Sequence, residues 1–357
     1  MSGIRHHILP RFLLKGFASR KEKQNYFAWV FRHEAVPFEA NIDKIAVSKK
    51  FYDSNVLDVD LEITDAETEL GEYVNTLRRI TYNTRLDVGL LPNLLTHLEL
   101  RTRHLRESLL DVTNLLSDEI VHLLNDKSTI KRLVLNKIKR EPNLLYEQIY
   151  ERFEVNKFPP ALRNLFANFV FLKSQQILES QQFSKEIDRG LSIIADTFAR
   201  EATVRLPQAI KNGHIEGLKR GLFSNIQVDR YRELKFRLVV LKKGFLILGD
   251  SAIIIESEPG TKYKPHLEAN DKIKSIYLPI SKFQLIAGQK DGDNSTININ
   301  KILALIAKCS REFFVSSDNT IEKQKFAKSI GKNAQLLSKQ EVLMIVSKWI
   351  EKEFVKK

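Results

Sequence analysis

The spacing of hydrophobic residues changes along this chain, and that change limits the fold more than any other feature. Between residues 60 and 225, apolar residues recur at three- and four-residue intervals, as on the buried faces of amphipathic helices. Between residues 233 and 290 they alternate with polar residues in short runs separated by turns, a pattern typical of strands. We therefore predict an α+β fold, with a mainly helical middle region and a small antiparallel sheet formed by the N-terminal and C-terminal parts.

The two ends of the chain complete this arrangement. Residues 1–55 are a mixed β segment whose aromatic run at 26–31 predicts a strand. A helix is expected over residues 300–315, and Ser338 with Glu341 has the capping-box spacing that begins a last helix. The expected organisation is one domain over residues 1–317, with C-terminal helices over 318–357 packed on it.

Apolar residues recur every seven positions between residues 98 and 123. The two series are Leu98, Leu105, Val112 and Leu109, Leu116, Leu123. This heptad spacing predicts a long amphipathic helix with a coiled-coil-like seam. The seam can pack within the chain, or it can pair with a second copy or with a partner helix.

The chain is basic, with a formal net charge of +13. The charge is uneven: residues 1–50 hold ten Lys/Arg and four Asp/Glu, net +6, whereas residues 51–125 hold six and fourteen, net −8. A basic excess attracts polyanions, so RNA or DNA is an expected partner. The alternative is a solvated basic surface with no partner.

The single cysteine, Cys309, excludes an internal disulfide and a cysteine-rich zinc site, and it favours a reducing compartment. No run of about 18 apolar residues is present, as a membrane span would require. The first residues are too polar for a signal peptide. We expect a cytoplasmic protein without a membrane partner.

Two adjacent histidines near the start, His6 and His7, are the first candidates for catalysis. In an extended segment they point to opposite sides, so one can act in a site while the other packs. Histidine serves as a general acid, a general base or a metal ligand near neutral pH. The alternative is an exposed or hydrogen-bonded pair with no chemical role.

Carboxylates supply the other candidates. Glu62, Asp65 and Glu69 have the spacing of one helix face, and Glu62 and Glu69 are predicted to hold Mg²⁺ or Mn²⁺. A solvated acidic helix start is the alternative. Asp250, in Gly-Asp-Ser between two apolar runs, is a catalytic candidate if it faces a cleft, although this tripeptide also forms hairpin turns.

Arg101 and Lys15 are predicted to bind substrate, because their charges can stabilise a phosphate. The alternative is that both side chains lie on solvated basic surfaces and bind no substrate. The chain has no phosphate-binding glycine loop, dinucleotide fingerprint, nucleophile elbow or HExxH helix. We therefore expect no nucleotide cofactor.

The opening segment carries a longer motif. Residues 6–17 read His-His-x-x-Pro-x-x-x-Leu-x-x-Phe, followed by Trp29-Val30-Phe31, Phe51-Tyr52 and Leu61-Glu62. Arg101-Thr102, Leu278-Pro279-Ile280-Ser281 and Asn300 follow in order. This pattern resembles a bacterial family known as domain of unknown function 4238, over roughly residues 5–317. Of that family's Thr-Ser-Asp-Asn-Pro step, only Asp250 is present here.

The resemblance implies one compact domain and adds weight to His6 and His7, but it implies no reaction. We expect a nucleic-acid-directed protein, either a nuclease or a phosphodiesterase-like enzyme. By analogy, such an enzyme fits a bacterial defence or toxin effector. The alternative is a non-catalytic nucleic-acid-binding or protein-interaction component.

Overall fold

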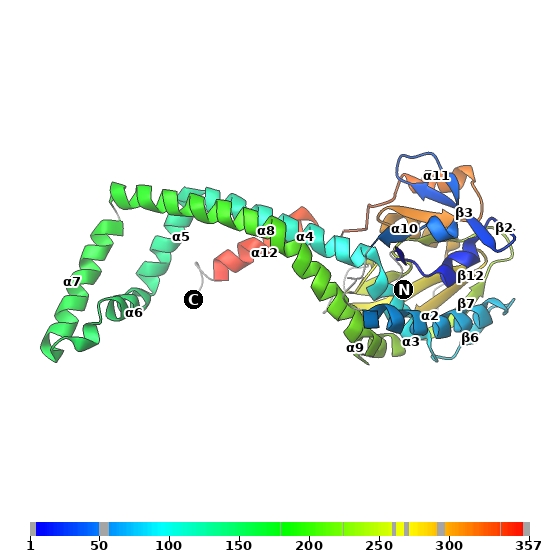
Figure 1. Ribbon diagram of the computed structural model, residues 1–357, viewed down its shortest axis with the longest axis horizontal. Coiled ribbons are helices and arrows are strands. Elements are labelled where there is room, and N and C mark those ends of the chain that lie inside the picture. The colour runs from blue at the N-terminus through cyan, green and yellow to red at the C-terminus, as the bar shows by residue number, and fades with distance from the viewer. Residues whose placement is uncertain are drawn as a thin grey trace. The chain divides into compact units, whose positions relative to one another are not determined.

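The computed structural model has the α+β fold that the spacing of apolar residues predicts (Figure 1). It describes residues 5–49, 57–178, 180–223, 225–258, 262–267, 271–290, 297–335 and 337–352. The chain divides into two compact units. Unit 1 comprises residues 1–109 and 210–336, and unit 2 comprises residues 110–209 and 337–357.

The larger sheet of unit 1 has six antiparallel strands in the order β10-β9-β11-β12-β7-β6. Their bounds, in that order, are Lys262–Lys264, Ile254–Glu258, Lys272–Ser281, Gln284–Gln289, Lys235–Val240 and Thr84–Leu86. Nearly every residue of the central strands β11 and β12 is buried, apart from Lys272 and Lys274 at the start of β11, so these strands are covered on both faces. Antiparallel strands are present between residues 233 and 290, but β8 (Ile247–Gly249) belongs to the second sheet.

A second sheet joins the two ends of the chain. Its strands are β2 (Arg20–Glu22), β3 (Asn25–Arg32), β13 (Phe313–Ser316) and β8 (Ile247–Gly249), with β4 (Phe38–Asn41) also paired to β3. Phe314 of β13 lies opposite Phe31 of β3, and their rings stack with centroids 4.8 Å apart. The predicted sheet between the N-terminal and C-terminal parts is confirmed by this pairing. A separate ribbon pairs β1 (Arg5–His7) with β5 (Val47–Lys49).

Helices cover the strands of unit 1. In Figure 1, α2 and α3 lie on one side of the strands, and α10 and α11 lie on the other. Arg78, at the end of α2, fixes three segments together: its guanidinium donates to the carbonyl oxygens of Ile280 and Phe12, each at 2.8 Å. The helices are α1 (Arg11–Leu14), α2 (Leu57–Arg78), α3 (Leu91–Arg101), α9 (Asn225–Arg232), α10 (Ile299–Cys309) and α11 (Ile321–Ala327).

The helix expected over residues 300–315 is shorter than the sequence pattern indicated. Helix α10 ends at Cys309, and Ser310 has the extended dihedrals φ −68° and ψ 140°. Residues 313–316 instead form β13 between β3 and β8. The aromatic and β-branched residues Phe-Phe-Val favour a buried strand there, and tertiary pairing supplies its partners.

The seam predicted over residues 98–123 is divided between two helices. Helix α3 ends at Arg101, Thr102 has extended dihedrals, and α4 begins at Arg103 and runs to Asn125. Leu98 is buried in the core of unit 1, whereas Leu109 is 37% exposed. The seam is therefore not one continuous surface, and its use in self-association stays a prediction.

Unit 2 is built from helices in the part of the chain that the structure describes. The capping box of Ser338 and Glu341 at the start of α12 is present as predicted. The predicted domain boundary at residue 317 stays a prediction. The two compact units are defined by contacts within the chain, which do not show whether a segment folds independently. The helices in or entering unit 2 are α4, α5 (Lys127–Arg140), α6 (Pro142–Arg152), α7 (Pro160–Leu178), α8 (Gln181–Phe223) and α12 (Lys339–Ile350).

Candidate functional site

Helix α3 carries three buried ionisable residues at alternate positions among leucines. His97, Glu99 and Arg101 are 5%, 2% and 4% exposed. Helices normally bury an apolar stripe, and a buried charge is costly unless it is paired and hydrogen-bonded. The partners of these three side chains therefore define the polar interior of unit 1.

Arg101 connects α3 to the N-terminal strand. Its Nε and Nη2 atoms donate to the main-chain carbonyl oxygen of His7 at 3.1 and 2.6 Å. Its Nη1 atom forms an ion pair with Glu67 of α2 and lies 3.5 Å from Nε2 of His97. Arg101, predicted to bind substrate, thus sits inside the protein with its guanidinium directed at internal acceptors. The sequence did not predict that Glu67 or His97 would lie beside Arg101.

His7 lies at the edge of this polar group. Its Nδ1 atom is buried and has no hydrogen-bond partner. Burial, aided by the charges of Arg11 and Arg101, lowers the pKa of His7 to about 4. At neutral pH the ring is therefore uncharged. His6 pairs with Ser48 through β1 and β5, but its side chain lies outside the described part of the structure.

A cavity of about 140 Å³ lies beside His97. Glu69 is exposed and lines this cavity, whereas the side chain of Glu62 lies outside the described part of the structure. Among the described residues, no group of three or more His, Cys, Asp or Glu is arranged to hold a metal ion. A role for Glu62 and Glu69 with Mg²⁺ or Mn²⁺ stays a prediction.

Glu99 accepts two short hydrogen bonds from distant segments. Its carboxylate oxygens accept from the Tyr231 hydroxyl at 2.8 Å and from the Leu267 main-chain N–H at 2.7 Å. Tyr231 is fully buried, and burial together with the Glu99 charge raises the pKa of its hydroxyl well above the usual value. The hydrogen bond between Tyr231 and Glu99 fixes α9 against α3, so α9 covers the buried polar residues of α3 on that side.

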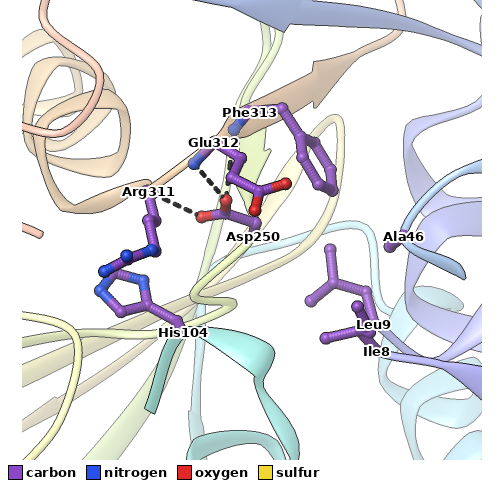
Figure 2. Close-up of a pocket in the computed structure, with 8 residues that line it drawn as sticks. All are labelled: Ile8, Leu9, Ala46, His104, Asp250, Arg311, Glu312 and Phe313. Carbon is purple, nitrogen blue, oxygen red and sulfur yellow. Dashed lines mark hydrogen bonds between the residues drawn. The ribbon is translucent and has the colours of Figure 1, made fainter. Parts of the chain in front are cut away.

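Asp250 follows strand β8 and fixes the segment that leads into β13. Its two carboxylate oxygens accept the main-chain N–H groups of Arg311, Glu312 and Phe313 at 2.8, 2.6 and 3.2 Å (Figure 2). Burial raises the pKa of Asp250 to about 6, although these bonds favour the charged form. The adjoining pocket, of about 20 Å³, has room for one water. It is lined by Ile8, Leu9, Ala46, His104, Asp250, Arg311, Glu312 and Phe313.

A different arrangement lies on the surface of unit 1, where two turns meet. The rings of Phe245 and Phe283 lie 5.3 Å apart, and the Lys282 ammonium is 5.5 Å from the centroid of each. Main-chain hydrogen bonds of 2.8 Å, from Leu241 to Phe283 and from Leu246 to Lys282, hold the turns together. Lysines 242 and 243, in the first turn, are exposed.

Lys15 lies beside these turns. The Lys282 N–H donates to the carbonyl oxygen of Gly16 at 2.9 Å, which places the exposed Lys15 next to the second turn. Lys323 of α11 approaches from another side, with its Nζ atom 5.3 Å from the Phe245 ring centroid. We define the basic–aromatic surface as Lys15, Lys242, Lys243, Phe245, Lys282 and Phe283.

The structure therefore brings Arg101 beside His7 and places Lys15 on the basic–aromatic surface. Asp250 and the segment that follows His7 share the small pocket of Figure 2. The roles predicted for these residues stay predictions. His97 and Glu99 were not among the predicted site residues. The sequence pattern that could have identified them is three polar residues, His97, Glu99 and Arg101, at every second position of a leucine-rich helix.

Comparison with known proteins identifies the family. The chain belongs to the family described as Protein of unknown function (DUF4238), whose model matches residues 5–352. The resemblance drawn from the opening motif is confirmed, and the match extends beyond residue 317. No curated protein and no solved structure matches the chain. None of the helices in the described part of the chain is long and apolar enough to cross a membrane.

Proposed function

We propose that this protein is nucleic-acid-directed and that it binds RNA or DNA through the basic–aromatic surface. The observation that carries the proposal is Lys282, whose ammonium lies 5.5 Å from the ring centroids of both Phe245 and Phe283. Single-stranded nucleic acids are bound where cations track the phosphates and aromatic rings stack on bases. Phe283 is 39% exposed and available for stacking.

The charge distribution supports the same surface. Unit 1 holds +10 of the +13 net charge and unit 2 holds +3, counting Lys and Arg against Asp and Glu in the two sets of residues. Lys242 and Lys243, in the turn before Phe245, are exposed to solvent, and so is Lys15, whose Nζ atom lies 5.6 Å from the Tyr26 ring centroid. Long-range attraction of a polyanion would therefore be directed toward unit 1, and stacking would follow at short range.

The test is fluorescence anisotropy with labelled single-stranded RNA, single-stranded DNA and duplex DNA over a range of salt concentrations. The variant Lys242→Ala/Lys243→Ala/Lys282→Ala should bind more weakly, and its salt slope should fall by about 0.7 for each lost contact with a single-stranded phosphate. The control, Lys173→Ala/Lys332→Ala/Lys348→Ala, removes the same charge from exposed positions elsewhere. Equal binding by the two variants would contradict the proposal.

The hydrolytic form of the proposal rests on His7. Its uncharged ring is the candidate general base, and the nearby Arg11, which pairs with Asp43 and is 53% exposed, is the candidate cation for phosphate charge. Incubation of the protein with labelled RNA and DNA, in Mg²⁺, in Mn²⁺ and in EDTA, tests this form. Cleavage that is lost in His7→Gln would support a nuclease; the cytoplasm, and a defence or toxin role, are the setting that we propose for such an enzyme. Salt-sensitive binding without cleavage would support a binding protein.

A further inference from the structure

A polar row crosses three neighbouring strands of the larger sheet. Glu256 of β9 lies opposite Tyr263 of β10 on one side and opposite Ser275 of β11 on the other. Residues paired across antiparallel strands point to the same face of a sheet, so these three side chains are neighbours there. Glu256 is only 6% exposed, and a buried carboxylate is costly unless donors bind it. The donors around Glu256 therefore determine what this row can do.

Three side chains bind the Glu256 carboxylate. Ser275 Oγ donates to its Oε2 atom at 2.6 Å, and Lys274 Nζ donates to its Oε1 atom at 3.2 Å. The third donor is the hydroxyl of Tyr263. Burial raises the pKa of Glu256, but these hydrogen bonds outweigh burial and hold the pKa below its usual value. The carboxylate is therefore ionised near pH 7, and it is held in a fixed position beside the phenol.

A β-bulge in β11 brings Lys274 to this carboxylate. The register of β11 against β9 shifts between Ile273 and Ser275, so Lys274 is the extra residue. In a regular strand Lys274 and Ser275 would point to opposite faces, whereas here both donate to Glu256. Bulges are common beside active sites, where they redirect a side chain. The strand thus departs from regular geometry at the point where it supplies a second donor and a cation.

Lys301 binds Tyr263 from another element. It lies in the first turn of α10, which packs against β9 and β10, and its Nζ atom donates to the Tyr263 hydroxyl oxygen at 2.6 Å. This hydrogen bond is exposed to solvent. The phenol thus has a carboxylate that accepts its proton and an ammonium that stabilises negative charge on its oxygen. A nucleophile with an adjacent base, itself oriented by further groups, is the usual arrangement of covalent catalysis.

We propose that Tyr263 is the nucleophile of a phosphodiester-transfer site whose substrate is a nucleic acid, an inference that rests on the proposed function. The Tyr263 oxygen forms a bond to phosphorus, and the bond from phosphorus to the 5′ or 3′ oxygen of the sugar breaks. Glu256 takes the phenolic proton, and the leaving oxygen takes a proton from water. Lys274 and Lys301 stabilise the charge on the phosphate oxygens. The products are a phosphotyrosyl diester and a free hydroxyl.

The test detects a covalent adduct between the full chain and labelled DNA or RNA, single-stranded and duplex, on denaturing gels. Substrates with sulfur at the leaving 5′ or 3′ position are included, because a departing thiolate does not readily reverse the step. The unaltered protein should retain the label, and mass spectrometry should place a nucleotide on Tyr263. Tyr263→Phe should abolish the adduct. Tyr82→Phe, at a tyrosine that is 66% exposed, should leave it unchanged.

A second variant tests the base. Glu256→Gln keeps the shape of the side chain and should slow adduct formation by about 100-fold or more. Tyr263→Phe should fold normally, because Ser275 and Lys274 still bind Glu256, and thermal unfolding checks both variants.

Anisotropy titrations of the same proteins separate this inference from the proposed function. Binding of nucleic acid without an adduct on any substrate overturns the inference and leaves the proposed function standing. An adduct that persists in Tyr263→Phe also overturns it. If the protein binds no nucleic acid and forms no adduct, both proposals fail. Adduct loss in Tyr263→Phe with unchanged affinity supports both.

Discussion

Arg101 holds the main-chain carbonyl oxygen of His7 with two hydrogen bonds, from Nε at 3.1 Å and from Nη2 at 2.6 Å. These residues are 94 positions apart in the sequence. The forked contact connects α3 to β1, and the same guanidinium neutralises Glu67. The N-terminal motif is therefore fixed from inside the protein by a helix of the middle region.

Replacing Arg101 should destabilise unit 1 strongly. In Arg101→Met, Glu67 keeps its charge, with a side chain only 22% exposed, and the His7 carbonyl loses both donors. Breaking a buried ion pair in this way costs about 3–5 kcal/mol. Urea unfolding followed by circular dichroism measures the change. Arg79→Met, at an exposed arginine just after α2, is the control and should change stability by less than about 0.5 kcal/mol.

The hydroxyl of Tyr231 should contribute measurably to stability through Glu99. Tyr231→Phe keeps the ring and removes only the donor that lies 2.8 Å from the Glu99 carboxylate. Leaving a buried acceptor without one of its donors costs about 1–3 kcal/mol. If the two groups interact directly, Glu99→Gln should cost less in the Tyr231→Phe background than alone. Additive losses in this double-mutant cycle would contradict a direct interaction.

Stability should fall as the solution is acidified below pH 6.5. The pKa values of His7, His97 and His214 are lowered to about 4, chiefly by burial, so the folded state favours their neutral forms. The unfolded chain binds protons first, near pH 6.5, so stabilisation present above this pH is lost as pH falls toward 4. For the fully buried His97 the slope reaches about 1.4 kcal/mol per pH unit.

The pKa shift of Asp250 changes the stability in the opposite direction, so that acidification stabilises the folded state. Its pKa rises from 3.8 to about 6 in the folded state, so its ionisation costs stability as pH rises through this interval. Acidification therefore returns some stability through Asp250 while the three histidines remove more. Urea unfolding at pH 7 and pH 5 measures the sum. Equal or greater stability at pH 5 would show that these histidines are hydrated in solution.

The fold class followed from the sequence because hydrophobic spacing reports local structure directly. The strand at residues 26–31 and the capping box at Ser338 are both present. The strand at residues 313–316 did not follow, because its pairing with β3 and β8 depends on segments far away in the sequence.

The candidate sites could be only partly predicted from the sequence, for a related reason. The opening motif drew attention to His7, but Glu67 and His97, which contact the Arg101 that bonds the His7 carbonyl, lie 60 and 90 residues further along the chain. Nothing in their local sequence marks them as partners. The basic–aromatic surface combines two turns and residue 15, so composition indicated its charge but not its position.

Phe283 should contribute to nucleic-acid affinity through stacking, not charge. Phe283→Ala is expected to weaken binding of single-stranded RNA by about 1–3 kcal/mol while leaving the salt dependence unchanged. Anisotropy titrations at two salt concentrations separate these effects. Phe38→Ala is the matched control, because Phe38 is 45% exposed and has Arg32 5.9 Å from its ring centroid. Equal losses in both variants would argue against a defined stacking position.

Self-association through the heptad seam of residues 98–123 should use only its α4 part. Leu98 is 1% exposed in the core of unit 1 and is unavailable, whereas Leu109 is 37% exposed. Light scattering after size exclusion, over a range of protein concentrations, should show association that Leu109→Gln weakens. Helix α7 also exposes apolar side chains, with Leu165 and Leu172 at 69% and 60%. If Leu165→Gln/Leu172→Gln abolishes association and Leu109→Gln does not, the contact belongs to α7, because large exposed apolar patches are the usual sites of association.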